Sequence, residues 1–113
     1  MINSNHNIKF SYLYRDGANY KQFGQVIFIN DKKISVEEIR ETIKGYLIDE
    51  LWFYANKWNI PDLHFTEYKW DEEIDHSWHE FESIEETNEA ITDNRSIGEF
   101  LLHIKEHAKH LVE

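Results

Sequence analysis

An alternating run of side chains near the N-terminus constrains the fold of this chain most. Between residues 8 and 14, every second residue is a large apolar or aromatic one, a period typical of a half-buried β-strand. Residues 23–29 are rich in Val, Ile and Phe and predict a second strand. Turn-forming residues at 15–19 separate the two, so we expect an antiparallel hairpin in which Gly17 or Asn19 takes a positive φ.

Two capping boxes predict where helices begin. The segments 35–38 and 96–99 each start with Ser and end with Glu, the pattern in which both side chains hydrogen-bond to backbone N–H groups. Apolar residues then recur at helical spacing over 36–47 and 97–111. Each stripe predicts a helix that buries one face.

The remaining segments complete the order β-β-α-β-β-α. Residues 51–58 predict a short helix or an irregular aromatic segment, 63–66 a third strand, 74–84 a fourth strand and 85–95 a loop. At 113 residues the chain is long enough for one core, so 1–113 is expected to be a single α+β domain. Its architecture is a small antiparallel sheet with two helices on one face.

In the predicted fourth strand, side chains are expected to alternate strictly between the two faces of the sheet. That alternation assigns one set of residues to one face, namely Ile74, His76, Trp78, Glu80, Glu82 and Ile84. It assigns the intervening set to the opposite face, namely Asp75, Ser77, His79, Phe81 and Ser83.

Charge is concentrated in one stretch. The chain carries a net charge of −10, and residues 67–89, the acidic segment, contain ten acids against the single base Lys69. Such a field argues against binding to a nucleic-acid backbone and suits a basic protein or a cation, or simply a solvated face.

The chain has no cysteine, which agrees with a cytoplasmic location. The first residues do not resemble a signal peptide, and no apolar run is long enough to cross a membrane.

The segment 75–81 gathers two imidazoles, two carboxylates, an indole and a phenyl ring. Zinc requires three or four converging ligands, and two histidines three residues apart point to opposite faces of a strand. We therefore expect no metal and no cofactor, with a metal-dependent hydrolase using His76, His79 and Glu80 as one alternative. A His stripe at 103, 107 and 110 is expected to be a solvated helical face.

The first turn offers a ligand-binding corner. Arg15 and Lys21 suit an anionic group, and Tyr20 suits a planar ring. Alternatively, Arg15 forms an ion pair with the acidic segment. Because the domain is too small to bury every indole, one or two are expected to line a groove or an interface. The predicted ligand-binding residues are Tyr14, Arg15, Asn19, Tyr20, Lys21, Trp70, His76, Trp78, His79 and Glu80.

Three stretches, Tyr12–Lys21, Ile60–Phe65 and Asp75–Phe81, resemble a family of small uncharacterised bacterial and phage proteins. The resemblance covers most of the chain and implies an accessory protein of a phage or mobile element. It implies no activity and no catalytic residue.

We expect a non-enzymatic binding module that sequesters a small anionic or nucleotide-like molecule. The alternatives are an inhibitor that docks residues 67–89 on a basic host protein, and the hydrolase. The edges of so small a sheet also predict pairing between chains, which would give a homodimer.

Overall fold

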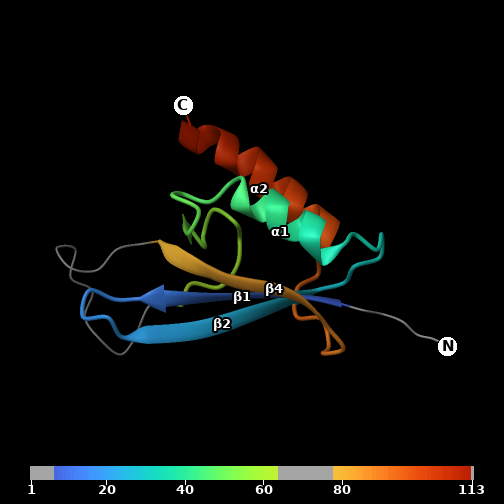
Figure 1. Ribbon diagram of the computed structural model, residues 1–113, viewed down its shortest axis with the longest axis horizontal. Coiled ribbons are helices and arrows are strands. Elements are labelled where there is room, and N and C mark those ends of the chain that lie inside the picture. Colours follow the sequence, from blue (N-terminus) through green and yellow to red (C-terminus); the bar gives the residue numbers. More distant parts are fainter. Residues whose placement is uncertain (1–6, 64–77, 113) are drawn as a thin grey trace.

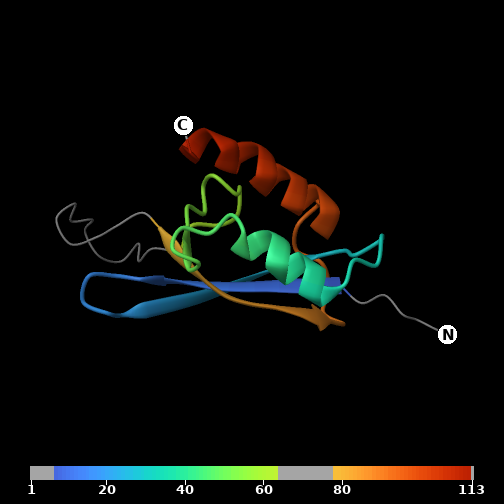
Figure 2. The ribbon, with the colours of Figure 1, turned by 45° about the horizontal axis from the view of Figure 1, so that its top comes forward.

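A four-stranded antiparallel sheet with two helices on one face forms the framework of the computed structural model (Figures 1 and 2). The structure describes residues 7–63 and 78–112, with side chains as far as residue 107. In chain order the elements are β1 (Asn7–Arg15), β2 (Lys21–Phe28), α1 (Val36–Lys44), β3 (Trp52–Phe53), β4 (His79–Thr87) and α2 (Ile97–Val112). The sheet order is β2-β1-β4-β3. The predicted α+β class and element order are confirmed.

β1 and β2 form the predicted antiparallel hairpin, with register from Ile8 opposite Phe28 to Arg15 opposite Lys21. In the turn, the Asp16 carboxylate accepts hydrogen bonds from two backbone N–H groups, each at 2.9 Å. Asn19 takes the positive φ, at 71°, whereas no described glycine does. A side chain that bonds its own turn is a common reason for Asn and Asp at such positions.

Both helices begin at the predicted Ser caps. The Ser35 hydroxyl accepts a hydrogen bond from the Glu38 N–H at 3.1 Å. At the start of α2 the pairing is reciprocal: the Glu99 N–H donates to Ser96 Oγ at 3.1 Å, and the Ser96 N–H donates to Glu99 Oε1 at 2.8 Å. α1 is shorter than its apolar stripe, because the backbone leaves the helix at Gly45.

The core lies between the sheet and the helices and combines isoleucine side chains with a cluster of aromatic rings. Phe10 of β1 packs edge-on against Phe53 and Phe100, with ring centroids 5.7 and 5.5 Å away. Trp58 is 2% exposed and stacks on Phe53 at 4.3 Å. The Tyr12 hydroxyl donates to a backbone carbonyl, that of Pro61, at 2.7 Å, and burial raises the pKa of Tyr12. The buried hydroxyl is thereby satisfied.

A β-bulge at Glu82 breaks the alternation of β4. Tyr12 lies opposite Phe81, but the preceding residue of β1, Ser11, lies opposite Ser83, so Glu82 has no partner in β1. Phe81 and Ile84 consequently share the helix-covered face. The strict alternation expected for this strand is therefore wrong at Ile84, because an extra residue shifts every later side chain to the other face.

Three other expectations about the elements are corrected. The aromatic segment 51–58 contributes β3, whose two residues pair with β4 at Trp52–Glu80 and Phe53–His79. Leu63 is not in a strand, and the rest of the predicted strand 63–66 lies outside the described residues. The predicted loop 85–95 starts too early, since β4 continues to Thr87 opposite Asn7.

Candidate binding surface

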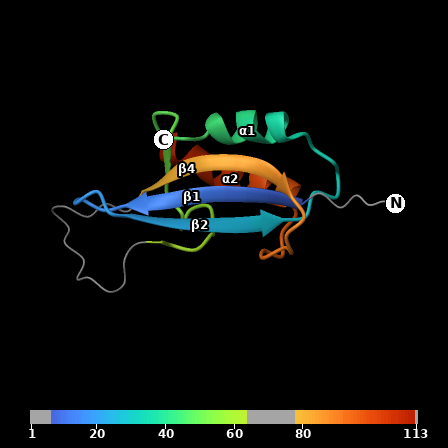
Figure 3. The same ribbon diagram turned by 60° about the horizontal axis from the view of Figure 1, so that its bottom comes forward.

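The strand register brings side chains from all four strands into one row on the sheet face turned away from the helices, the outer face. Figure 3 views the sheet from this side. Phe23 of β2 lies opposite Leu13 of β1, Leu13 lies opposite Glu80 of β4, and Glu80 lies opposite Trp52 of β3. Residues directly opposite each other in a sheet point to the same side. Leu13 forms the buried floor of this row, at 8% exposed.

An ion pair on the outer face joins β1 to β4, beside the row of Phe23, Leu13, Glu80 and Trp52. Arg15 lies opposite Lys21 and reaches diagonally to Glu80, donating from Nε to Oε2 at 2.7 Å and from Nη2 to Oε1 at 3.1 Å. Its Nη1 also donates to Asn19 Oδ1 at 2.6 Å. The hydrogen bond to Glu80 raises the pKa of Arg15. The alternative that Arg15 pairs with the acidic segment is confirmed, with Glu80 as partner.

Indole and phenol rings gather at the β3–β4 side of this surface. The Trp78 ring lies 6.0 Å from that of Trp52 and 6.4 Å from that of Tyr54. Trp78 is 37% exposed, in contrast to the enclosed Trp58. Trp78 is therefore an indole that lies partly outside the core, and its expected place in a groove or an interface stays a prediction. We call the set Arg15, Lys21, Phe23, Trp52, Trp78 and Glu80 the candidate surface.

The predicted site residues divide into three groups. Those brought together on or beside the candidate surface are Arg15, Asn19, Lys21, Trp78 and Glu80. Tyr20 precedes Lys21 in the chain and is 68% exposed. Tyr14 and His79 lie instead in the core, their ring centroids 5.2 Å apart and each 1% exposed. Trp70 and His76 lie outside the described residues. Of the predicted rings that the structure describes, Trp78 and Tyr20 are thus the exposed ones.

His79 is held as a buried acceptor. Its Nε2 accepts a hydrogen bond from the Leu63 N–H at 2.9 Å, which places no proton on that nitrogen. Asp62 Oδ1 lies 3.4 Å from the same nitrogen. Because that nitrogen carries no proton, the two groups do not form an ion pair. His79 and Glu80 point to opposite faces of β4, since one lies opposite Phe53 and the other opposite Trp52. They do not form a joint acid–base pair.

The described part of the acidic segment is only partly neutralised. Lys9 forms an ion pair with Glu89, which raises the pKa of Lys9 and lowers the pKa of Glu89. Glu80 is taken up by Arg15. The remaining carboxylates of this stretch are exposed, namely Glu82, Glu85 and Glu86.

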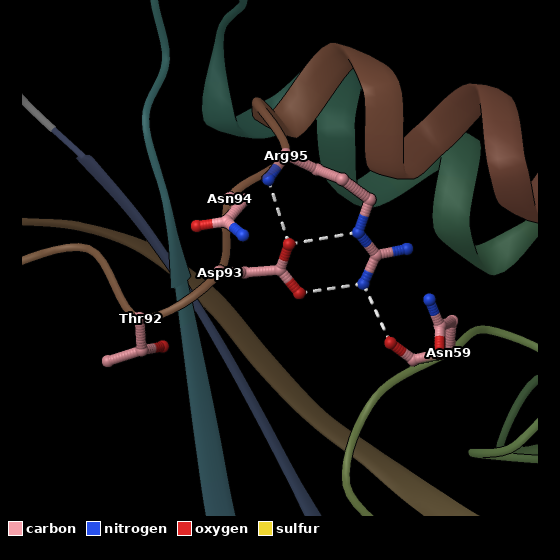
Figure 4. Close-up of a pocket in the computed structure, with 5 residues that line it drawn as sticks. All are labelled: Asn59, Thr92, Asp93, Asn94 and Arg95. Atoms are coloured by element: carbon pink, nitrogen blue, oxygen red, sulfur yellow. Dashed lines mark hydrogen bonds and ion pairs between the residues drawn. The ribbon is translucent and has the colours of Figure 1, made fainter.

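An open polar hollow of about 410 Å³ lies at the other end of the molecule and was not expected from the sequence (Figure 4). Its lining residues are Asn59, Thr92, Asp93, Asn94 and Arg95. The Arg95 guanidinium donates to both Asp93 oxygens at 2.9 and 2.7 Å and to the carbonyls of Trp58 and Asn59 at 3.1 and 2.8 Å. The local signal was Asp93 two residues before Arg95, directly ahead of a helix cap.

Arg95 serves the fold rather than a ligand. Its guanidinium carbon also lies 5.1 Å from the ring centroid of Phe100 and 5.7 Å from that of Phe28, distances typical of cation–π contacts. The neighbouring Thr92 bonds to the backbone of Ile27 at the edge of β2. At the hollow, the loop that contains Trp58 and Asn59 and the loop that precedes α2 are therefore tied to each other and to the edge of β2.

Among the described side chains, those of residues 7–63 and 78–107, no three of the types His, Cys, Asp or Glu are grouped as metal ligands would be. None of the helices in this part of the chain has the length and apolar character needed to cross a bilayer. No known protein family, curated protein or solved structure matches the chain.

Proposed function

We propose that this chain is a non-enzymatic binding module whose ligand is a planar ring bearing an anionic group, as in a nucleotide. The site is the candidate surface. The observation that carries the proposal is the row across the sheet, which sets exposed aromatic rings beside the Arg15–Glu80 pair and Lys21.

The rings supply the stacking part of the site. Trp78 is 37% exposed beside Trp52, and Tyr20 is 68% exposed next to Lys21. An exposed aromatic side chain stacks on any flat heterocycle, and each such stack contributes about 1–3 kcal/mol in single-stranded nucleic-acid complexes. A small ligand with one base or ring would use the same contact without needing a phosphate backbone.

The cations supply the anionic part. Lys21 is exposed and directly opposite Arg15, so the two positive side chains lie on adjacent strands of one face. Glu80 occupies the guanidinium fork of Arg15. A phosphate or carboxylate fits the same fork geometry, so the ligand competes with Glu80 for Arg15.

Thermal shift and Trp fluorescence with mononucleotides and dinucleotides test the proposal. A ligand of the predicted class raises Tm and quenches Trp78, and the effect weakens in Trp78→Leu and Lys21→Gln. The matched controls are Leu102→Ala and Lys32→Gln, which change an exposed apolar residue and an exposed lysine elsewhere. If no compound in the panel raises Tm at millimolar concentration, the proposal fails.

The family resemblance of the three sequence stretches supports a sequestering role for such a module, in an accessory protein of a phage or mobile element. Sequestration requires tight binding without turnover. Recovery of the ligand chemically unchanged after incubation with the protein is the expected result.

A second candidate is an inhibitor that docks the acidic segment on a basic protein. The exposed carboxylates of Glu82, Glu85 and Glu86 favour it. Association driven by such a patch slows steeply as salt is added. A partner that binds the triple Glu→Lys variant at these positions as fast as it binds the unchanged protein would exclude this candidate.

The hydrolase alternative finds less support. His79 is buried, its Nε2 accepts a backbone hydrogen bond, and Glu80 is bound to Arg15 on the opposite face. The two groups therefore do not face a common point at which both could act on a water molecule.

A further inference from the structure

We infer that the open half of the β2 edge pairs with the same edge of a second copy of the chain, giving a two-fold symmetric dimer with one continuous sheet. β2 forms one margin of the sheet, and the opposite margin is β3, which has only two residues. Beyond β3, the described edge of β4 carries the exposed Glu82, Glu85 and Glu86, whose charges oppose pairing with another acidic chain, so β2 is the margin suited to act as a template for another strand.

The direction of its backbone groups follows from the hairpin. The Tyr20 carbonyl accepts a hydrogen bond from the Asp16 N–H, so the backbone carbonyl of Tyr20 is directed toward β1. Backbone groups alternate in direction along a strand, so the N–H and C=O groups of the odd-numbered residues of β2 are directed away from β1. Ile27 confirms this pattern, since its N–H and C=O bond to Thr92 outside the sheet. Lys21, Phe23 and Gln25 therefore present their N–H and C=O groups at the margin.

Loop 92–97 divides this margin into a covered and an open half. It bonds to Ile27 and, through the Ile97 N–H, to the carbonyl of Ile29. Among the described residues, nothing is hydrogen-bonded to the outward groups of residues 21–25. Residues 21–25 of two copies can therefore pair along their whole length. The loop at Ile27 blocks pairing of any longer stretch of β2.

These limits select one register. In an antiparallel pair, hydrogen-bonded residues exchange both of their bonds. With Phe23 opposite Phe23 of the second copy, Lys21 of each copy lies opposite Gln25 of the other. Every outward N–H and C=O of the open half is then satisfied, and no like charges face each other.

Charge favours a second copy as the occupant. The chain carries −10 overall, yet β2 contains no acid and a single base, Lys21. Two copies therefore approach most easily along β2. Phe23 is 59% exposed at the centre of the paired edge. Pairing covers both Phe23 rings, and aromatic cross-strand pairs are stabilising.

Sedimentation equilibrium of the whole chain, from about 10 µM to about 1 mM, measures the expected reversible dimer. Phe23→Lys places like charges directly opposite each other and is expected to weaken association about tenfold or more. Leu102→Lys is the matched control, because Leu102 is similarly exposed, at 55%, but lies on α2. It should leave association unchanged.

Cross-linking tests the register independently of stability. The chain has no cysteine, so Phe23→Cys introduces a single thiol. Hydrogen-bonded antiparallel partners lie about 5.5 Å apart between Cα atoms, within the range of disulfides. Mild oxidation should link Phe23→Cys into a covalent dimer and leave Leu102→Cys largely monomeric. A monomeric chain at all concentrations, or a dimer indifferent to Phe23→Lys, overturns the inference.

Discussion

Arg15 and Glu80 are 65 residues apart in sequence and meet as a two-point ion pair on the outer face of the sheet. The Arg15 side chain is 35% exposed and that of Glu80 is 11% exposed, so the pair lies at the boundary between water and packed protein. It joins β1 to β4 at the end of the sheet where the candidate surface lies. The pair therefore links the stability of the sheet to the proposed binding of an anion.

Glu80→Gln is predicted to lower stability and strengthen ligand binding at the same time. The substitution removes the charge that faces Arg15 but keeps the size of the side chain, so Tm should fall by a few degrees. An anionic ligand no longer competes with a carboxylate for the guanidinium, so its affinity should rise several-fold. Thermal shift and calorimetric titration measure the two effects. Weaker anion binding in this variant would contradict competition between ligand and Glu80.

Arg95→Ala is predicted to destabilise the fold by about 2–3 kcal/mol, because it leaves a mostly buried carboxylate and two carbonyls without their donor. Arg95→Lys should recover only part of this loss, since an ammonium group lacks the planar fork that reaches Asp93, Trp58 and Asn59. Urea unfolding measures both. Arg40→Ala is the control, since Arg40 makes one hydrogen bond of 3.3 Å to the Ile84 carbonyl. Equal losses in the two alanine variants would refute a special role for Arg95.

Acidification is predicted to destabilise the fold by protonating Asp93, which removes its ion pair with Arg95. The hydrogen bond from Arg95 lowers the pKa of Asp93 below its ordinary value of 3.8. A carboxylate with a depressed folded-state pKa contributes stability that is fully present above 3.8 and is lost as the pH falls through the folded value. Tm measured between about pH 5 and about pH 2 should therefore fall less steeply in Asp93→Asn than in the unchanged chain. Asp31→Asn, at an exposed position, should keep the full slope.

Local sequence signals account for the parts of the fold that depend on neighbouring residues. The alternation over 8–14 and the turn after it predicted the hairpin, and the two Ser-x-x-Glu boxes predicted both helix starts. β3 escaped prediction because two residues carry no periodicity. Its formation depends on β4 and on a local bond from the Ile48 N–H to the Trp52 carbonyl at 2.7 Å.

For the candidate site, the sequence predicted the kinds of residues and the signs of their charges but not which residues meet. Sequence patterns indicated that Arg15 would meet an acid, but choosing Glu80 among the acids of 67–89 required the strand register. The predicted ligand-binding residues included both His79 and Trp78, although the expected strand alternation placed them on opposite faces. One of them faces the core and the other is partly exposed.

His103 is predicted to titrate below the ordinary histidine pKa of 6.5. Burial lowers its pKa most, and His107, stacked at 3.9 Å between ring centroids, and Arg95 lower it further. The Lys57 carbonyl, which accepts from Nε2 at 3.0 Å, and Glu106 act in the opposite direction. The neutral ring therefore contributes stability above 6.5 that is lost as the pH falls through the lower folded value.

NMR titration of the histidine ring protons measures this shift. His107→Gln should move the His103 midpoint upward, because the neighbouring positive charge is removed. An unchanged midpoint in that variant, or a midpoint above 6.5 in the unchanged chain, would contradict the prediction.

Deletion of Glu82 is predicted to leave the protein folded. The bulge puts two residues of β4 between Phe81 and Ile84, yet both of these side chains face the helices. When Glu82 is deleted, the side chains of Phe81 and Ile84 face the helices and that of Ser83 between them faces the outer side. This is the alternation of a regular strand, and it keeps the register with β1. The cost should stay within about 2 kcal/mol, arising from the altered twist of β4. Deletion of Ser11 from the unbulged β1 is the control. It moves Tyr12 and Tyr14 to the outer face relative to Phe10, so near-UV circular dichroism and cooperative unfolding should be lost there and retained without Glu82.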